Sequence, residues 1–165
     1  MDQTGLNCPH VLAHSFGARV AIKLFSVEQD RIKKLVITGG AGLVKPRTPQ
    51  YMRQITRYRR VKKLFPKFAE KHFGSSEYKS LSPLMRQSFK KIVNEDLKSY
   101  AAKISAPTLL IYGKEDTVTP PSEEGETFHS LIANSTLELM EGGHFCFSDN
   151  PKEFNFKLFR FLTES

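Results

Sequence analysis

Short apolar runs alternate with segments of helical character along this chain of 165 residues. The runs are "HVLA", "KKLVITGG", "APTLLIYG" and "STLELM". In the second run, Leu35, Val36 and Ile37 are followed closely by glycines, which is typical of a buried parallel strand. Neighbouring parallel strands need a crossover connection, which is usually a helix. The alternation therefore predicts an α/β fold, with a mostly parallel sheet of about four strands flanked by helices.

The segments between and after these runs carry helix signals. From Ala18 to Val27, apolar residues recur at the spacing of one helical face. The segment "SEEGETFHSLI" has glutamates near its start, where they interact favourably with a helix N-terminus. In the last segment Asn150 is a suitable N-cap, and Pro151 occupies the first helical position. These segments supply the helices that cover the predicted sheet.

The middle of the chain has a different composition. Ten basic residues and a single acidic one, Glu70, lie between Lys45 and Lys71. Apolar residues in "YMRQITRYRRVKKLF" recur at helical spacing, Pro66 should break that helix, and Ser82 is a suitable N-cap for another. We therefore expect residues 43–103 to form a small helical cap inserted into an α/β core made of residues 1–42 and 104–165.

Three residues with complementary chemistry follow predicted strands. Ser15 follows the first strand, Asp116 the third and His144 the fourth. Sites in open α/β sheets form beyond the carboxyl ends of parallel strands, so these side chains could meet at one edge. A serine hydroxyl needs a base to become a good nucleophile, histidine can take its proton near neutral pH, and a carboxylate can orient the histidine. The set favours nucleophilic catalysis by Ser15.

The motifs around these residues resemble those of α/β-hydrolase-fold serine hydrolases. "AHSFG" is similar to the nucleophile elbow, "LLIYGKEDTVTP" to the acid-bearing strand and loop, and "MEGGHFCFSDNPKEFN" to the histidine loop, in the family's chain order. The resemblance implies that Ser15 is the nucleophile, His144 the general base and Asp116 its orienting acid. It also implies that the backbone N–H of Phe16 donates to the oxyanion and that no cofactor is needed. The substrate would be a small acyl compound, and the bond that is hydrolysed would be an ester or a related acyl bond.

The sequence departs from the family pattern in two places. Ala13 replaces the first glycine of the elbow, and the strands that normally precede the elbow are absent, along with the loop that supplies half of the oxyanion hole. We therefore expect a partial α/β-hydrolase fold, resembling the C-terminal part of the family, in a truncated hydrolase. The nucleophile strand would then be an apolar sheet edge, and homodimerisation across this edge is expected.

Some residues and functions have competing interpretations. His14 should point away from Ser15 and is interpreted as structural or as pocket lining, while Glu115 and Asp149 compete with Asp116 as the acid. A chain without a complete oxyanion hole could also be inactive, or a binding module that retains the triad residues. The basic cap could bind nucleic acid, but its aromatic residues fall on the apolar face, so a solvated face is the preferred interpretation.

Composition excludes several other classes. No apolar run approaches the roughly 18 residues of a membrane span. The two cysteines, Cys8 and Cys146, have no second ligand at a metal-like spacing, so neither a disulfide scaffold nor a metal site is expected. The first residues do not resemble a signal peptide. Because only two cysteines occur, a reducing cytoplasm is the expected location.

Overall fold

The computed structural model describes residues 3, 5–44, 49–65, 82, 85, 91–92 and 94–164. It divides the chain into two compact units, one formed by Met1–Leu43 and Asp96–Ser165 and the other by Val44–Glu95. The cap was expected to extend from 43 to 103. Residues 96–103 instead belong to the first unit, because the short helix α6 (Lys98–Ala101) places Ala101 in its hydrophobic core.

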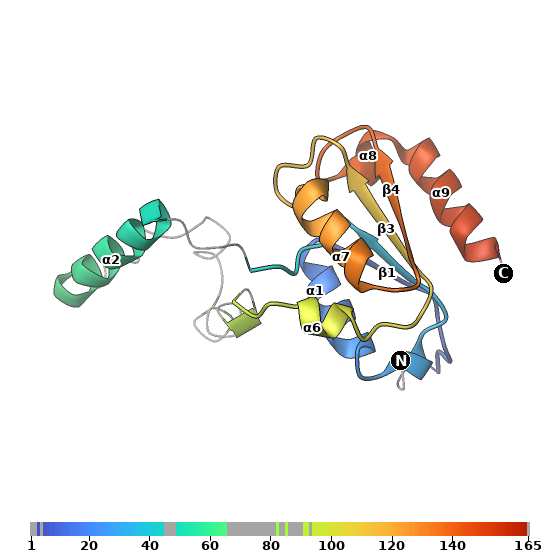
Figure 1. Cartoon of the computed structure of the whole chain (residues 1–165), viewed down its shortest axis with the longest axis horizontal. Helices are drawn as coiled ribbons and strands as arrows, with labels where there is room; N and C mark the ends of the chain where they lie inside the picture. Colours follow the sequence, from blue (N-terminus) through green and yellow to red (C-terminus); the bar gives the residue numbers. More distant parts are fainter. Residues whose placement is uncertain are drawn as a thin grey trace. The chain divides into compact units, whose positions relative to one another are not determined.

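The first unit contains a parallel sheet (Figure 1). Its strands are β1 (Val11–His14), β2 (Leu35–Thr38), β3 (Thr108–Gly113) and β4 (Ser135–Met140), and they lie in the order β1-β2-β3-β4. All three pairings are parallel, with Val11 opposite Leu35, Leu35 opposite Thr108, and Thr108 opposite Ser135. This arrangement confirms the predicted α/β fold with four parallel strands.

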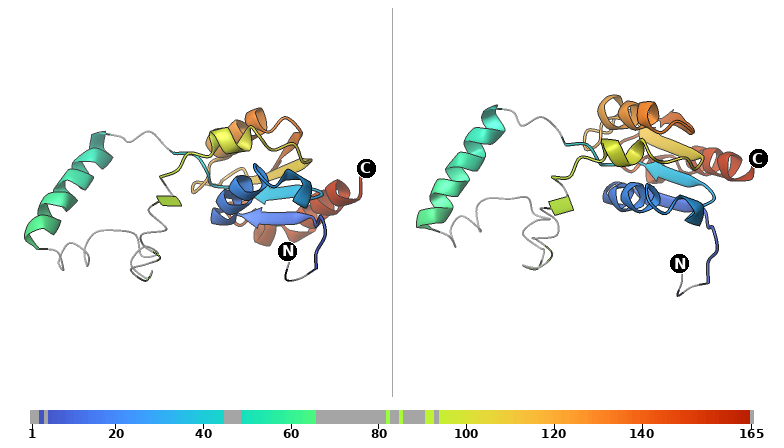
Figure 2. Two further views of the ribbon diagram at one scale, coloured as in Figure 1. Left: turned by 90° about the horizontal axis from the view of Figure 1, so that it is seen from below. Right: turned by 60° about the horizontal axis from the view of Figure 1, so that its bottom comes forward.

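Helices cover both faces of the sheet (Figure 2). One face carries α1 (Phe16–Phe25), α6 and α7 (Glu126–Leu131), and the other carries α8 (Cys146–Asp149) and α9 (Pro151–Thr163). Two short turns complete the unit, η2 (Gln29–Arg31) and η3 (Pro121–Gly125), and η3 is a π-helical turn leading into α7. The first helix begins at Phe16 rather than at the expected Ala18, because the turn at Ser15 leads directly into it.

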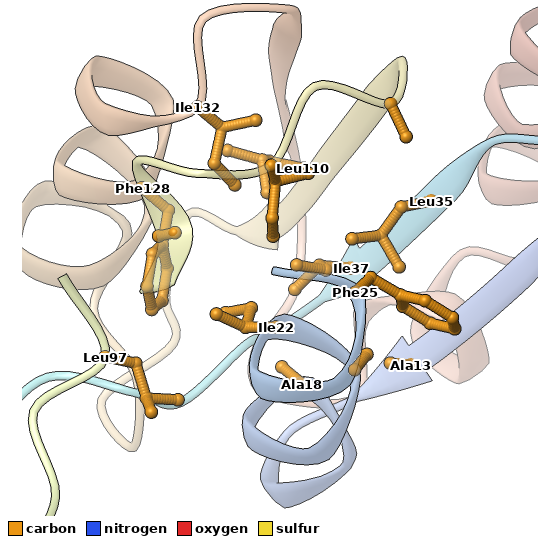
Figure 3. Packing of buried hydrophobic residues seen from close by; sticks show 14 of the residues in the cluster. Ala13, Ala18, Ile22, Phe25, Leu35, Ile37, Leu97, Leu110, Phe128 and Ile132 are labelled. Carbon is orange, nitrogen blue, oxygen red and sulfur yellow. The ribbon is translucent and has the colours of Figure 1, made fainter. Parts of the chain in front are cut away.

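Alternate residues of the buried strands separate into two hydrophobic clusters. Leu35 and Ile37 pack with Ile22 and Phe25 of α1 (Figure 3), whereas Val36 packs on the opposite face with Phe154 of α9. A buried parallel strand has apolar side chains on both faces, which explains the continuous apolar runs in the sequence. The two clusters fix the positions of the strand ends, and so they also fix the positions of the polar residues that directly follow those ends.

The second unit is described mainly through α2 (Pro49–Leu64). Its six basic residues and lack of acidic ones agree with the predicted basic helix. The hydroxyl of Ser82 accepts a hydrogen bond from the amide of Met85 at 3.3 Å, the contact expected of an N-cap. Pro66 lies outside the described residues, and of the second predicted helix Met85, Lys91 and Ile92 are described, all three as helical. No helix in the described part of the chain is both long enough and apolar enough to cross a membrane.

The β1 edge leads to a prediction about assembly. Among the described residues β1 pairs only with β2, and apolar side chains are exposed on both sides of it: Leu12 on the strand, and Val20 and Leu24 on α1. We expect two copies to pair along this edge, because unpaired backbone groups beside apolar surface favour strand addition. Sedimentation should show a dimer that Leu12→Lys dissociates; a wild-type monomer at high concentration would contradict this.

Candidate active site

The candidate site lies where β1, β3 and β4 end. The strands are parallel and in register, so the residues that follow them emerge at the same edge of the sheet. Ser15 directly follows β1, Asp116 lies in the loop after β3, and His144 lies in the loop after β4. The sheet therefore brings together three residues that are far apart in the sequence.

Ser15 occupies a tight turn between β1 and α1. Its backbone has φ 52° and ψ −116°, a conformation that is uncommon for residues other than glycine. Three backbone hydrogen bonds hold this turn: the Ser15 amide donates to Thr38 O at 3.0 Å, and the amides of Ala18 and Ala41 donate to Ser15 O at 3.1 and 3.2 Å. A strained residue held in this way raises its side chain above the sheet edge, as in a nucleophile elbow.

Ala13, where the family pattern has glycine, fits this turn. A Cβ placed on Gly17 would lie 3.9 Å from the Cβ of Ala13, which is an ordinary van der Waals contact. Ala13 is itself buried in the hydrophobic cluster beneath α1. The methyl group of Ala13 therefore packs in the core with room beside Gly17, and the turn at Ser15 forms with alanine in place of the family's glycine.

The three side chains form a continuous hydrogen-bonded line. Ser15 Oγ lies 2.9 Å from His144 Nε2, and Asp116 Oδ2 lies 2.8 Å from His144 Nδ1. A proton on Nδ1, donated to Asp116, leaves the Nε2 lone pair free to accept the Ser15 hydroxyl proton. This arrangement can chemically activate the serine oxygen as a nucleophile.

The Asp116 carboxylate is buried and accepts several hydrogen bonds. The amides of Val118 and Thr119 donate to its Oδ1 at 2.8 and 2.9 Å, and the Thr119 hydroxyl lies 2.8 Å from its Oδ2. Burial alone would raise the pKa of this carboxyl, but the hydrogen bonds from Thr119, His144 and Val118 together hold the pKa below its ordinary value. Asp116 is therefore a carboxylate at neutral pH.

The lowered pKa of Asp116 predicts how stability responds to acid. Since this pKa lies below that of the unfolded chain, the unfolded state binds more protons as the pH falls below about 4, and the folded state loses stability there. Urea denaturation between pH 3 and pH 7 should show a shallower loss for Asp116→Asn than for the wild type. Equal slopes for the two proteins would contradict the assignment.

His14, interpreted from the sequence as structural or as pocket lining, packs beside the site. Its ring centroid is 4.8 Å from that of His144 and 5.0 Å from that of Phe147, and its Nδ1 lies 3.0 Å from Thr38 O. Burial is the main cause of a lowered pKa of His14, and the nearby His144 lowers it further. We interpret His14 as a neutral ring that donates to Thr38 O and packs against His144. The aromatic residues that follow His144 in the sequence were the available signal for this cluster.

The two competing carboxylates are placed elsewhere. Glu115 is exposed, and its amide donates to Gly142 O at 3.1 Å. Asp149 Oδ2 accepts a hydrogen bond from the Gly143 amide at 3.1 Å and so supports the backbone of the histidine loop. Within the described part of the chain, no group of three or more His, Cys, Asp or Glu side chains could hold a metal ion. The structure therefore places Asp116, and neither Glu115 nor Asp149, against His144.

A serine on a strand–turn–helix elbow at the edge of a parallel sheet, with helices on both faces, defines the class of α/β-hydrolase-fold proteins. Residues 10–152 match the family model described as "Serine hydrolase (FSH1)", and the chain belongs to this family. It is therefore an α/β-hydrolase-type hydrolase. No curated protein sequence matched the chain.

Solved structures of the same fold resemble the chain over nearly all its length. An esterase from Exiguobacterium antarcticum is 25% identical, with a TM-score of 0.67, and the match covers 99% of this chain and 69% of the esterase. A hydrolase from Pseudomonas aeruginosa PA01 is 24% identical, with a TM-score of 0.70 and coverage of 99% and 68%. A meta-cleavage product hydrolase from Pseudomonas fluorescens IP01 is 22% identical, with a TM-score of 0.68 and coverage of 98% and 67%.

Proposed function

We propose that the chain hydrolyses a carboxylic ester, or a related acyl bond, through a Ser15–His144–Asp116 triad. The observation that carries the proposal is the line of hydrogen bonds from Ser15 Oγ through both nitrogens of the His144 ring to Asp116 Oδ2. The similarity to an esterase, at 25% identity, supports the choice of an ester substrate. The substrate would be a small acyl compound.

In the proposed reaction, Ser15 Oγ attacks the carbonyl carbon while His144 Nε2 accepts the hydroxyl proton. The new imidazolium is stabilised by the Asp116 carboxylate. His144 then donates this proton to the leaving alkoxide, and the acyl group remains on Ser15. A water molecule, deprotonated by His144, then attacks the acyl-serine. The bond between the acyl carbon and Ser15 Oγ breaks, His144 returns its proton to Oγ, and the carboxylic acid is released.

The proposed oxyanion donor is the backbone N–H of Phe16. Phe16 is the residue directly after the nucleophile and the first residue of α1, where the helix dipole also favours negative charge. Each oxyanion donor typically contributes about 100- to 1,000-fold to the rate. A tetrahedral analogue, such as a boronic acid, should shift the Phe16 amide resonance in an NMR spectrum of the wild type.

We propose that the acyl group of the substrate is apolar. Each proposed triad residue has an exposed apolar neighbour in the sequence: Phe16 beside Ser15, Val118 near Asp116 and Phe145 beside His144. Phe145 is 56% exposed, and its ring centroid lies 5.3 Å from that of His144. An apolar chain extending from the carbonyl carbon could cover this ring and remove it from water.

The substrate preference can be measured with a series of p-nitrophenyl esters. For the wild type, kcat/KM should rise with acyl length by up to about fourfold per buried methylene. Phe145→Ala should flatten this dependence. Phe156→Ala provides a matched control, because Phe156 lies on α9 and is 64% exposed. An unchanged chain-length dependence in Phe145→Ala would exclude Phe145 from the acyl site.

A further inference from the structure

Thr119 contacts three loops of the site through one hydroxyl group. Its side chain is buried, at 3% exposure, and lies in the loop after β3. The Oγ1 atom is 2.8 Å from Asp116 Oδ2, 3.2 Å from His144 Nδ1 in the loop after β4, and 3.0 Å from Gly39 O directly after β2. Three of the four strands are therefore linked at this single oxygen.

We propose that Thr119 is a positioning residue of the active site, whose hydroxyl orients the Asp116 carboxylate and the His144 imidazole and anchors both to Gly39. This proposal rests on the proposed function of Ser15, His144 and Asp116. Thr119 does not contact the reacting atoms. It acts through the two residues that activate Ser15.

The proton of the Thr119 hydroxyl has two possible acceptors. A threonine hydroxyl donates one proton and can accept with its lone pairs. The proton lies between these two oxygens as a bifurcated donor, and because a carboxylate is a stronger acceptor than a backbone carbonyl, it is donated mainly to Asp116 Oδ2 and more weakly to Gly39 O while His144 is neutral. The lone pairs of Oγ1 then face His144 Nδ1, and the N–H can be shared between Asp116 and Thr119. Both contacts favour a proton on Nδ1 and a free lone pair on Nε2.

The two oxygens of Asp116 are held by different means. Oδ1 accepts from the backbone amides of Val118 and Thr119, and these bonds do not depend on the side chain at position 119. Oδ2 is contacted by the Thr119 hydroxyl and by His144 Nδ1. Replacing the threonine side chain therefore removes support at the oxygen that faces the histidine while leaving the backbone bonds to the other oxygen in place.

The contact with Gly39 keeps the loop after β2 close to the histidine. Gly39 has φ +50°, and a Cβ built on it would lie 3.1 Å from His144 Nδ1 and 3.2 Å from Cε1. A side chain there would press on the imidazole, so the close approach requires glycine. The bond from Thr119 to Gly39 O spans the same gap, and it fixes the distance between this loop and the ring.

The test compares variants at position 119 that separate the hydroxyl from the methyl group. Thr119→Val keeps the volume and loses the hydroxyl, whereas Thr119→Ser keeps the hydroxyl and loses the methyl. For p-nitrophenyl butyrate we expect Thr119→Val to lower kcat about 10- to 100-fold, the usual effect of a hydrogen bond to a charged group, with KM changed less than about twofold. Thr119→Ser should recover most of kcat.

Thr108→Val is the matched control. Thr108 is also buried, at 1% exposure, and its hydroxyl donates to Ala106 O at 2.9 Å, but it begins β3 while the site follows the end of that strand. It should lose stability without losing kcat. If Thr119→Val does not fold, Thr119→Ala replaces it as the variant without a hydroxyl.

A second measurement does not depend on turnover. The Nδ1–H resonance of His144 should exchange with water faster in Thr119→Val than in the wild type or in Thr119→Ser. Equal exchange rates, or equal losses of kcat in the serine and valine variants, would overturn the proposal. A wild type that neither hydrolyses esters nor reacts at Ser15 would overturn the proposed function instead, and the exchange measurement would still decide the role of Thr119 in the hydrogen-bonded cluster.

Discussion

Replacing Ser15 by alanine is expected to remove nearly all ester hydrolysis by the chain. The Ser15 hydroxyl is the group that lies 2.9 Å from His144 Nε2, and alanine leaves the histidine with no oxygen to activate. In serine hydrolases of unrelated fold, loss of the nucleophile costs on the order of 10⁶-fold in kcat. The measurement is the initial rate of p-nitrophenyl butyrate hydrolysis by the purified chain.

Ser26→Ala is a suitable control for this experiment. Ser26 is buried at the end of α1, and its hydroxyl donates to Lys23 O at 2.9 Å, so its loss should affect stability alone. A fluorophosphonate probe should add its mass to the wild type and to Ser26→Ala, at Ser15 in both. Turnover or labelling that persists in Ser15→Ala would show that another residue is the nucleophile. A folded wild type with neither property would favour a binding module.

Replacing Asp116 by asparagine is expected to lower kcat by about 10⁴-fold, the effect known for this substitution in another serine hydrolase. The reason lies in the two amides that donate to Oδ1. An asparagine must place its carbonyl oxygen there, because its NH₂ group cannot accept these bonds. The NH₂ group then faces His144 Nδ1 and donates to it. His144 is forced to carry its proton on Nε2, where it can no longer accept the proton of Ser15.

The expected change of tautomer can be measured by nitrogen NMR of His144. In Asp116→Asn the proton of the neutral imidazole should be on Nε2, whereas in the wild type it should be on Nδ1. Glu115→Gln is the matched control: it removes one negative charge from the adjacent, exposed position and should leave both kcat and the tautomer unchanged. A large loss of kcat with an unchanged tautomer would mean that Asp116 acts by its charge rather than by its orientation.

The predicted order of elements agrees with the structure because the signals are local. A buried parallel strand needs apolar residues on both faces, so Leu35 to Ile37 could be identified without a partner strand. Element ends were less accurate. The helix after Ser15 begins two residues earlier than expected, because Ser15 is both the strained turn residue and the N-cap of α1, so no residue separates the turn from the helix. Residues 96–103, expected in the cap, belong to the compact unit that contains the sheet, and the packing of Ala101 into its core is a long-range contact.

The proposed triad residues could be chosen from the sequence because each follows a strand in a motif of its own. The residues that surround the proposed triad could not be identified from the sequence. Thr119 is one of two threonines in "EDTVTP", and its contact with Gly39 O joins positions 80 residues apart. His14 was interpreted as structural or as pocket lining, and its packing against His144 joins the end of β1 to the loop after β4, residues that are far apart in the sequence.

The sequence by itself determined the fold class, the order of the strands along the chain and the identity of the serine, acid and histidine motifs, since periodicity and short motifs encode these locally. Only the tertiary structure decided which carboxylate faces His144 and what supports that carboxylate. These features depend on the distances between loops that follow different strands. Those distances are set by the register of the parallel sheet and by the packing of helices on both of its faces.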